Sequence, residues 1–312
     1  MGNLIRPLLL SAATVLLTGA YAQQDPMYTM YMWNTLSVNP GYAGSADLFT
    51  ASALMRKQWV GLAGAPSTQT LTAHAPLPLK SLGLGLSVMN ENVGPVRTTQ
   101  VFADFAYRIR ITRKARLAFG LKAGVEMFQA DLLGLQNVDT DDPYLQQNIT
   151  GKVKPNFGFG AYYWGSKGYI GLSAPKLLRN TWLRVDGNTS GNVEALQQEQ
   201  HYFLIGGYVF DLGPEVKLRP GFLLKAVQGA PLQLDLSTMV LLRERFWIGA
   251  AYRHGDSMDA LVAYQVTDQL RVGYAYDLSL TRLRTYNSGS HELMLTYDLR
   301  FDKKRMMSPR YF

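Results

Sequence analysis

The chain has 312 residues, enough for one large domain or two small ones. It contains no cysteine, which excludes disulfides, thiolate metal sites and a lipid anchor on an N-terminal cysteine. The mean hydropathy of −0.07 is too polar for a helical membrane protein, and the basic residues behind the net charge of +8 do not form the aromatic-interleaved patch that nucleic-acid binding needs.

Residues 1–22 are predicted to be a Sec signal peptide. Arg6 supplies the positive charge, residues 7–20 form a short apolar core, and residues 20–22 have the A-x-A form that signal peptidase recognises. The core is too short to span a membrane, and polar residues follow it at once. We therefore expect the mature chain to be exported.

Residues 23–47 are predicted to be a separate N-terminal segment, either periplasmic or a plug. Its first residues include an apolar set with helical spacing, but Pro40 and Gly41 end any helix. The sequence therefore predicts a short helix or an extended plug.

An alternation of apolar with small or polar side chains dominates the rest of the chain. From His291 to Phe301, one face carries His, Leu, Leu, Tyr, Leu and Phe, and the other carries Glu, Met, Thr, Asp and Arg. Side chains alternate across a strand, so each run has one apolar and one polar face. About fourteen such runs predict one transmembrane antiparallel outer-membrane β-barrel over residues 48–301. The predicted strands are 48–58, 67–75, 82–90, 98–109, 116–128, 154–164, 168–174, 201–210, 215–224, 232–242, 246–253, 260–266, 270–280 and 290–301.

The lengths of the connections give an independent indication. The three longest, residues 129–153, 175–200 and 281–289, follow the fifth, seventh and thirteenth predicted strands, so all lie at the same end of the barrel. Outer-membrane barrels have long extracellular loops and short periplasmic turns. The even number of strands then places both chain termini in the periplasm.

A soluble β-sandwich or lipocalin-like barrel would show the same alternation, with its apolar faces inward. The polar faces are rich in glycine, alanine and serine, which suits a barrel interior better than a water-facing surface. The number of strands is also too large for one small barrel. Both observations favour the membrane barrel.

Charges of both signs are predicted to face the lumen. A ring of one sign would indicate ion selectivity, whereas mixed charges can pair across neighbouring strands. We therefore expect a plugged or narrow lumen. The residues are Asp104, Arg108, Lys122, Glu126, Asp235, Arg271, Asp277, Glu292, Asp298 and Arg300.

The sequence contains no arrangement typical of catalysis or of a metal site. None of the four histidines has a second histidine at i+2, i+3 or i+4, and no cysteine can assist them. No G-x-S-x-G elbow accompanies the serines. We expect neither enzymatic activity nor a metal or other cofactor.

Basic residues gather on the predicted periplasmic side and in a tail of residues 302–312. They fit either solvated turns or a docking surface for a periplasmic partner, and the sequence favours neither. These residues are Arg108, Arg110, Arg113, Lys114, Arg116, Arg243, Arg245, Lys303, Lys304, Arg305 and Arg310.

Short blocks of sequence recur in a fixed order over the whole mature chain: Gln24 to Pro26, Asn39 to Gly44, Arg56 to Trp59 with Gly64 to Pro66, Lys154 to Gly160 with Gly171 to Pro175, Leu218 to Pro220, Gly249 to Arg253 and Gly289 to Glu292. This ordered set resembles the PorP/SprF family of outer-membrane proteins of the type IX secretion system. No block is specific alone, but their order is. Pro40 and Gly41 depart slightly from the family, which more often has Pro-Ala there.

This resemblance implies a non-enzymatic barrel of Bacteroidetes-type outer membranes that assists export or surface attachment of secreted proteins and adhesins, in some bacteria for gliding motility. The implied partners are membrane lipid, the translocon, periplasmic ring and peptidoglycan-linked lipoproteins, and the C-terminal domain of a secreted substrate. The matched residues Arg56, Trp59, Pro66 and Glu292 would serve structure or partner binding. The alternatives are a channel or transporter for a small solute and, with less support, an outer-membrane hydrolase.

Overall fold

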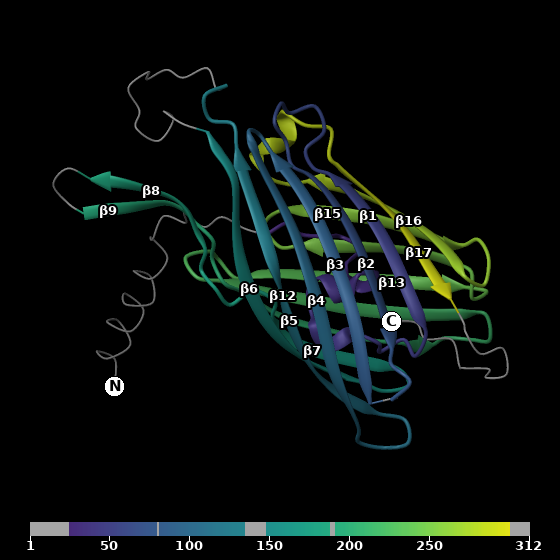
Figure 1. The fold of residues 1–312 in the computed structure, drawn as a ribbon. Coiled ribbons are helices and arrows are strands. Elements are labelled where there is room, and N and C mark those ends of the chain that lie inside the picture. The colour runs from purple at the N-terminus through teal and green to yellow at the C-terminus, as the bar shows by residue number, and fades with distance from the viewer. Residues whose placement is uncertain (1–24, 80, 135–147, 188–190, 300–312) are drawn as a thin grey trace, which may run out of the picture.

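The computed structural model describes residues 25–79, 81–134, 148–187 and 191–299 (Figure 1). The predicted signal peptide, the basic tail with Lys303, Lys304 and Arg305, and Arg300 lie outside the described residues.

A closed antiparallel β-barrel of 14 strands makes up the body of the protein, which confirms the predicted fold class (Figure 1). Each strand pairs with its neighbours along the chain, β10 pairs with both β7 and β12, and β1 pairs with β17 to close the ring. The two-residue strand β11 (Phe210–Asp211) lies beside the beginning of β12. The barrel strands are β1 (Phe49–Lys57), β2 (Ser67–Pro76), β3 (Leu82–Val93), β4 (Val96–Arg110), β5 (Arg116–Ala130), β6 (Ile149–Trp164), β7 (Gly168–Ala174), β10 (His201–Tyr208), β12 (Val216–Val227), β13 (Gln233–Leu242), β14 (Phe246–Arg253), β15 (Ser257–Gln265), β16 (Leu270–Ser279) and β17 (Ser290–Leu299).

Burial along the strands distinguishes a membrane barrel from a soluble one. On β5, Leu121 is 64% exposed, whereas its neighbour Lys122 is only 4% exposed. Phe119 and Val125 also face outward, and Glu126 is fully buried. A soluble barrel would bury the leucine and expose the lysine, so the outer surface of this barrel suits lipid rather than water.

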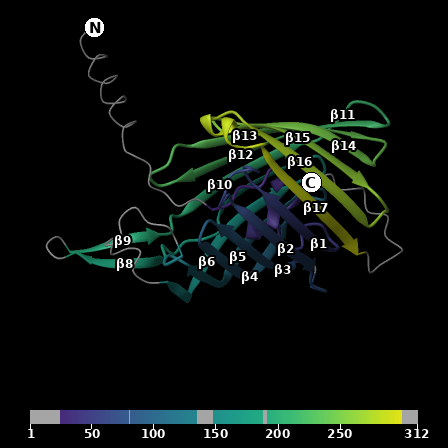
Figure 2. The same ribbon diagram turned by 90° about the horizontal axis from the view of Figure 1, so that it is seen from above.

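The three longest connections, residues 131–148, 175–200 and 280–289, all leave the same end of the barrel, here called the loop end. The opposite end, with its shorter connections, is called the turn end. By the rule for outer-membrane barrels, the loop end faces the outside of the cell. The sequence did not predict the hairpin of β8 (Thr181–Gly187) and β9 (Gly191–Gln197), which projects from the barrel within the second long connection (Figure 2).

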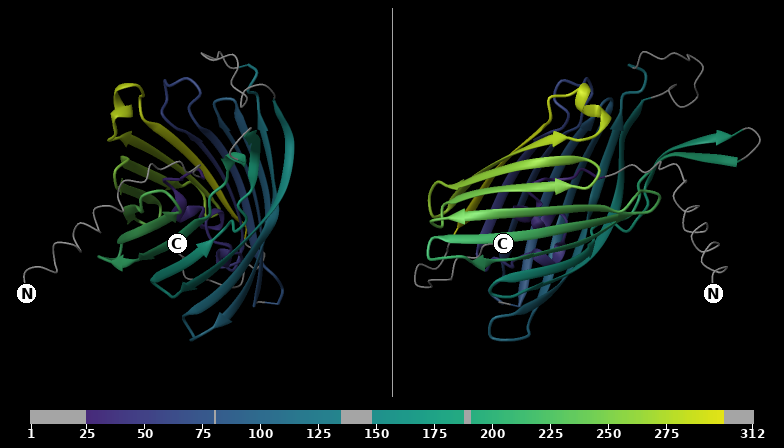
Figure 3. Two further views of the ribbon diagram at one scale, coloured as in Figure 1. Left: turned by 90° about the vertical axis from the view of Figure 1, so that its left-hand side faces the viewer. Right: turned by 180° about the vertical axis from the view of Figure 1, so that it is seen from behind.

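Residues 25–47, here called the plug, lie inside the barrel (Figure 3). Three short 3-10 helices, η1 (Tyr31–Trp33), η2 (Thr35–Ser37) and η3 (Pro40–Tyr42), replace the single helix that the spacing could have formed. Most plug side chains are buried, and they supply much of the apolar core within the barrel. None of the helices in the described residues is long and apolar enough to span a membrane.

The direction of the plug differs from the expectation that the chain begins at the periplasmic end. Asp25 contacts His201 at the loop end, whereas Asp47 lies at the turn end, where β1 begins. Strand parity fixes only the end at which the first strand starts. A segment that passes through the lumen therefore starts from the opposite end.

Glycines on the barrel wall give the plug its space. A Cβ atom on Gly120 of β5 would lie 2.2 Å from the backbone nitrogen of Gly41, and one on Gly83 of β3 would lie 2.2 Å from the carbonyl oxygen of Ala43. Any larger residue at these positions would displace the plug backbone.

Candidate functional site

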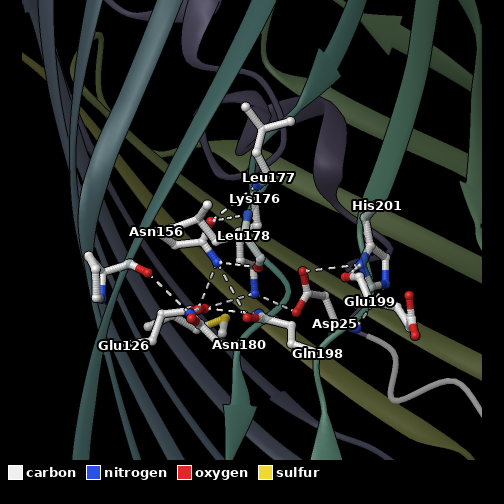
Figure 4. Close-up of polar contacts among 12 residues, drawn as sticks. Asp25, Glu126, Asn156, Lys176, Leu177, Leu178, Asn180, Gln198, Glu199 and His201 are labelled. Atoms are coloured by element: carbon white, nitrogen blue, oxygen red, sulfur yellow. Dashed lines mark hydrogen bonds and ion pairs between the residues drawn. The ribbon is translucent and has the colours of Figure 1, made fainter.

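The plug enters the lumen through a group of polar residues at the loop end, here called the loop-end anchor (Figure 4). It consists of Asp25, Glu126, Asn156, Lys176, Gln198 and His201. The Lys176 amine lies 2.5 Å from an Asp25 carboxylate oxygen and 3.2 Å from Glu126. The Asp25 backbone nitrogen donates to Nε2 of His201 at 3.1 Å. One cation thus joins the plug to both β5 and the second long connection.

Electrostatics keep this ion pair charged. Burial alone would lower the pKa of Lys176, but the Asp25 and Glu126 carboxylates outweigh it and raise that pKa. Burial would raise the pKa of Asp25, but Lys176 and His201 outweigh it and lower that pKa. Both groups therefore stay ionised near neutral pH.

Amide side chains complete the anchor around Glu126. Gln198 and Asn156 each donate to this carboxylate at 3.1 Å, and Asn180 donates at 3.3 Å. Oδ1 of Asn156 accepts from the backbone nitrogens of residues 177 and 178 at 3.1 and 3.0 Å. The base of the second long connection is thereby fixed to the barrel wall.

A second anchor lies where the first and last strands meet. Arg56 of β1 and Glu292 of β17 occupy paired positions in the register, and their side chains are 3.0 Å apart. A second nitrogen of Arg56 lies 2.6 Å from Asp277 of β16. The plug joins this group, because the Thr29 and Met30 backbone nitrogens donate to Glu292 at 2.9 and 2.7 Å. Arg56 and Glu292 thus hold both the closing seam and the plug.

The turn end of the plug is held by Asp47. Its carboxylate lies 2.8 Å from Arg108 and 2.7 Å from Arg116. The Gly44 backbone nitrogen donates to Nδ1 of His74 at 3.2 Å. Arg108 lies at the turn end and faces the lumen, as alternation along β4 predicts. Its side chain is buried, so it takes no part in the exposed basic turns at this end.

The other sequence candidates lie apart from these anchors. Trp59 and Pro66 belong to the connection between β1 and β2 at the loop end, and they shape that loop through the backbone. The Trp59 nitrogen donates to Ser290 at 3.2 Å, and the Pro66 carbonyl accepts from Gln58 at 2.9 Å. Arg113 and Lys114 are exposed in the turn between β4 and β5 at the turn end. Their role in partner binding stays a prediction.

Most other mixed charges predicted for the lumen are buried and paired. Lys122 lies 3.0 Å from Asp104, and Arg253 lies 2.9 Å from Asp235. The described residues contain no group of three or more histidine or acidic side chains suited to a metal ion. Paired charges in the lumen therefore stabilise the barrel.

A closed barrel with an apolar outer surface and a charged, plugged lumen defines the chain as a β-barrel protein of the outer membrane. A family model described as "Type IX secretion system membrane protein PorP/SprF" matches residues 20–297. The chain belongs to this family, as its sequence blocks indicated, and this membership implies association with components of that secretion system.

Solved structures similar to this chain share little of its sequence. The Acinetobacter baumannii outer membrane protein Omp33 is 9% identical with a TM-score of 0.44, covering 81% of this chain and 100% of its own. A Pseudomonas aeruginosa FadL homologue is 11% identical with a TM-score of 0.47, covering 89% and 96%. The CymD monoaromatic hydrocarbon channel is 11% identical with a TM-score of 0.48, covering 85% and 92%. No curated protein matches the sequence.

Proposed function

We propose that this protein is a closed platform of the type IX secretion system, which assists export or surface anchoring of secreted proteins and adhesins. The observation that carries the proposal is the plug, which joins the barrel wall at the loop end, at the closing seam and at the turn end. A lumen held shut in this way suits a binding role better than conduction. Catalysis is not part of the proposed role.

The two ends of the barrel would serve different partners. The loop end carries the second long connection with its hairpin, which would meet the C-terminal domain of a secreted substrate or the translocon. The turn end exposes Arg113 and Lys114, which would meet periplasmic ring or peptidoglycan-linked lipoproteins. In a gliding bacterium the exported substrate would include the motility adhesin.

Deletion of the gene tests the proposal. We expect the deletion strain to lose surface display of at least one type IX substrate, and the wild-type gene to restore it. Surface proteolysis and labelling of intact cells measure display, with an unrelated outer-membrane barrel as the control for membrane integrity. Normal display of every type IX substrate in the deletion strain would contradict the proposal.

A small-solute channel is the competing function, and the plug argues against it. The anchors lie along the path that a solute would take, and breaking a buried ion pair costs several kcal/mol, on the order of 3–5. A channel would need the plug to leave the lumen on every opening.

A further inference from the structure

A cluster of two arginines and three aromatic residues lies in the lumen near the turn end. Arg219 of β12 lies over the rings of Tyr169 and Trp247, 6.0 and 5.9 Å from their centroids. Arg271 of β16 lies 5.9 Å from the ring of Trp33 in the plug, and Trp33 packs edge-on against Trp247. These five residues are here called the turn-end arginine cluster.

Arg219 is an exception to the charge pairing seen among the described lumen residues. Its side chain is buried, yet no salt bridge joins it to a carboxylate of the described residues. One guanidinium nitrogen donates to the Met32 carbonyl at a long 3.3 Å, and the other, Nη1, has no protein acceptor in the described part of the chain. A buried cation without a counter-charge is costly.

A second buried donor in the cluster is also without an acceptor. Nε1 of Trp33 finds no partner among the described residues. Arg271 adds a further positive charge, which repels Arg219. Its Nε donates to Oε1 of Gln265 at 3.2 Å, and its guanidinium lies 3.8 Å from the carboxylate of Asp298. The cluster therefore offers N–H donors and positive charge, with few acceptors to satisfy them.

The residues of the turn-end arginine cluster indicate the chemical class of its ligand. An oxyanion accepts several hydrogen bonds at once and neutralises positive charge, and a guanidinium pairs with carboxylate or phosphate in a bidentate manner. The aromatic faces leave Arg219 little freedom, so its donors are pre-organised. Arg271 lies at the turn end, with 17% of its side chain exposed.

We propose that the turn-end arginine cluster is an oxyanion-binding site, with Arg219 and the indole N–H of Trp33 as donors to a carboxylate or phosphate group. Arg271 supplies additional positive charge at its entrance. The inference does not rest on the proposed secretion function, because it concerns the binding chemistry of the barrel itself.

The test titrates the purified full-length protein in detergent with sodium phosphate and, separately, with sodium acetate. Both series run against sodium chloride at matched ionic strength. Tryptophan fluorescence reports on the cluster through Trp33 and Trp247, and the thermal midpoint reports on binding to the folded state. We expect a saturable response to at least one oxyanion and none to chloride. Acetate alone would indicate a carboxylate ligand, and phosphate alone a phosphate group.

Arg219→Met removes the charge while it preserves much of the side-chain volume, and we expect it to weaken oxyanion binding at least about tenfold. Arg113→Met removes an exposed arginine at the same end and should leave binding unchanged. Trp33→Phe keeps an aromatic ring but removes the N–H donor, and we expect it to weaken oxyanion binding several-fold. This variant tests the proposal if the Arg219 variant does not fold. Equal responses to chloride and oxyanions, or full binding by Arg219→Met, would overturn the proposal.

Discussion

The loop-end anchor and the turn-end arginine cluster both bring plug residues against charged residues of the wall, but their charges are balanced differently. At the loop end, Lys176 lies between the carboxylates of Asp25 and Glu126, and amides satisfy the remaining oxygens. At the turn end, Arg219 has aromatic faces and one long hydrogen bond instead of a carboxylate. A satisfied network holds a segment in place, whereas an unbalanced one is suited to receive a counter-charge.

The largest expected effect comes from the seam between β1 and β17, which belongs to neither the loop-end anchor nor the turn-end arginine cluster. Glu292→Ala would leave Arg56 with a single carboxylate and two plug N–H groups without an acceptor. We expect it to lower the free energy of unfolding by about 3–5 kcal/mol. Denaturant unfolding in detergent measures this change. Arg243→Ala, which breaks an exposed ion pair with Glu215, is the matched control and should cost at most about 1 kcal/mol.

Replacing Lys176 and Arg219, the central cations of the two groups, tests the comparison most directly. Lys176→Met should destabilise the protein by about 1.5–3 kcal/mol, because it leaves Asp25 and Glu126 without their cation. Arg219→Met should cost less or even stabilise, because no salt bridge is lost among the described residues. The same unfolding measurements compare the two variants in buffer without phosphate or carboxylate. If Arg219→Met lost more unfolding free energy than Lys176→Met, Arg219 would be the better satisfied cation, which would contradict the comparison.

The fit of the plug between its ends can be tested with a single methyl group. Gly120→Ala would place a Cβ atom against the backbone of Pro40 and Gly41 and should cost about 1–3 kcal/mol through overpacking. The midpoint of thermal unfolding measures the change. Gly213→Ala, at an open position in a turn, is the control and should have almost no effect. Equal stability of the two variants would mean that the plug does not contact β5.

The smallest expected effect is a loss of stability at acidic pH that arises from the loop-end anchor alone. Burial opposes the ionised form of Asp25, but Lys176 and His201 prevail and lower its pKa below the ordinary 3.8. Ionised Asp25 therefore stabilises the folded state above about pH 4, and this contribution is lost as the pH falls through the folded-state pKa. Unfolding free energies at descending pH should fall less steeply for Asp25→Asn than for the wild type. Parallel curves of unfolding free energy against pH for the two proteins would mean that ionised Asp25 does not stabilise the fold, which would contradict the loop-end anchor.

The barrel could be predicted from the sequence because its signal is local. Alternation within each run identifies a strand, and the lengths of the connections give its orientation without any knowledge of tertiary contacts. In β5, the residues from Leu117 to Met127 suffice to separate the lipid face from the lumen face. The hairpin of β8 and β9 was missed because it lies within a long loop and has no place in the barrel pattern.

The anchors could not be predicted because their members are far apart in the sequence. Lys176 and Asp25 are separated by 151 positions, and Arg56 and Glu292 by 236. Arg56 was a candidate only through the family resemblance. Alternation also predicted that Glu292 faces the lumen, but it gave no indication that Glu292 pairs with Arg56. His201 and Asp25 are separated by 176 positions, and no local pattern connected them. Only the path of the plug through the lumen brings these residues together.

Single-channel recording tests most directly the central claim that the plug closes the barrel. The full-length protein is inserted into planar lipid bilayers at neutral pH, with a wide outer-membrane porin as the positive control for insertion. The plugged structure predicts a silent bilayer after insertion, apart from brief and irregular events. A steady, solute-selective conductance of the full-length protein would contradict the claim and favour the channel.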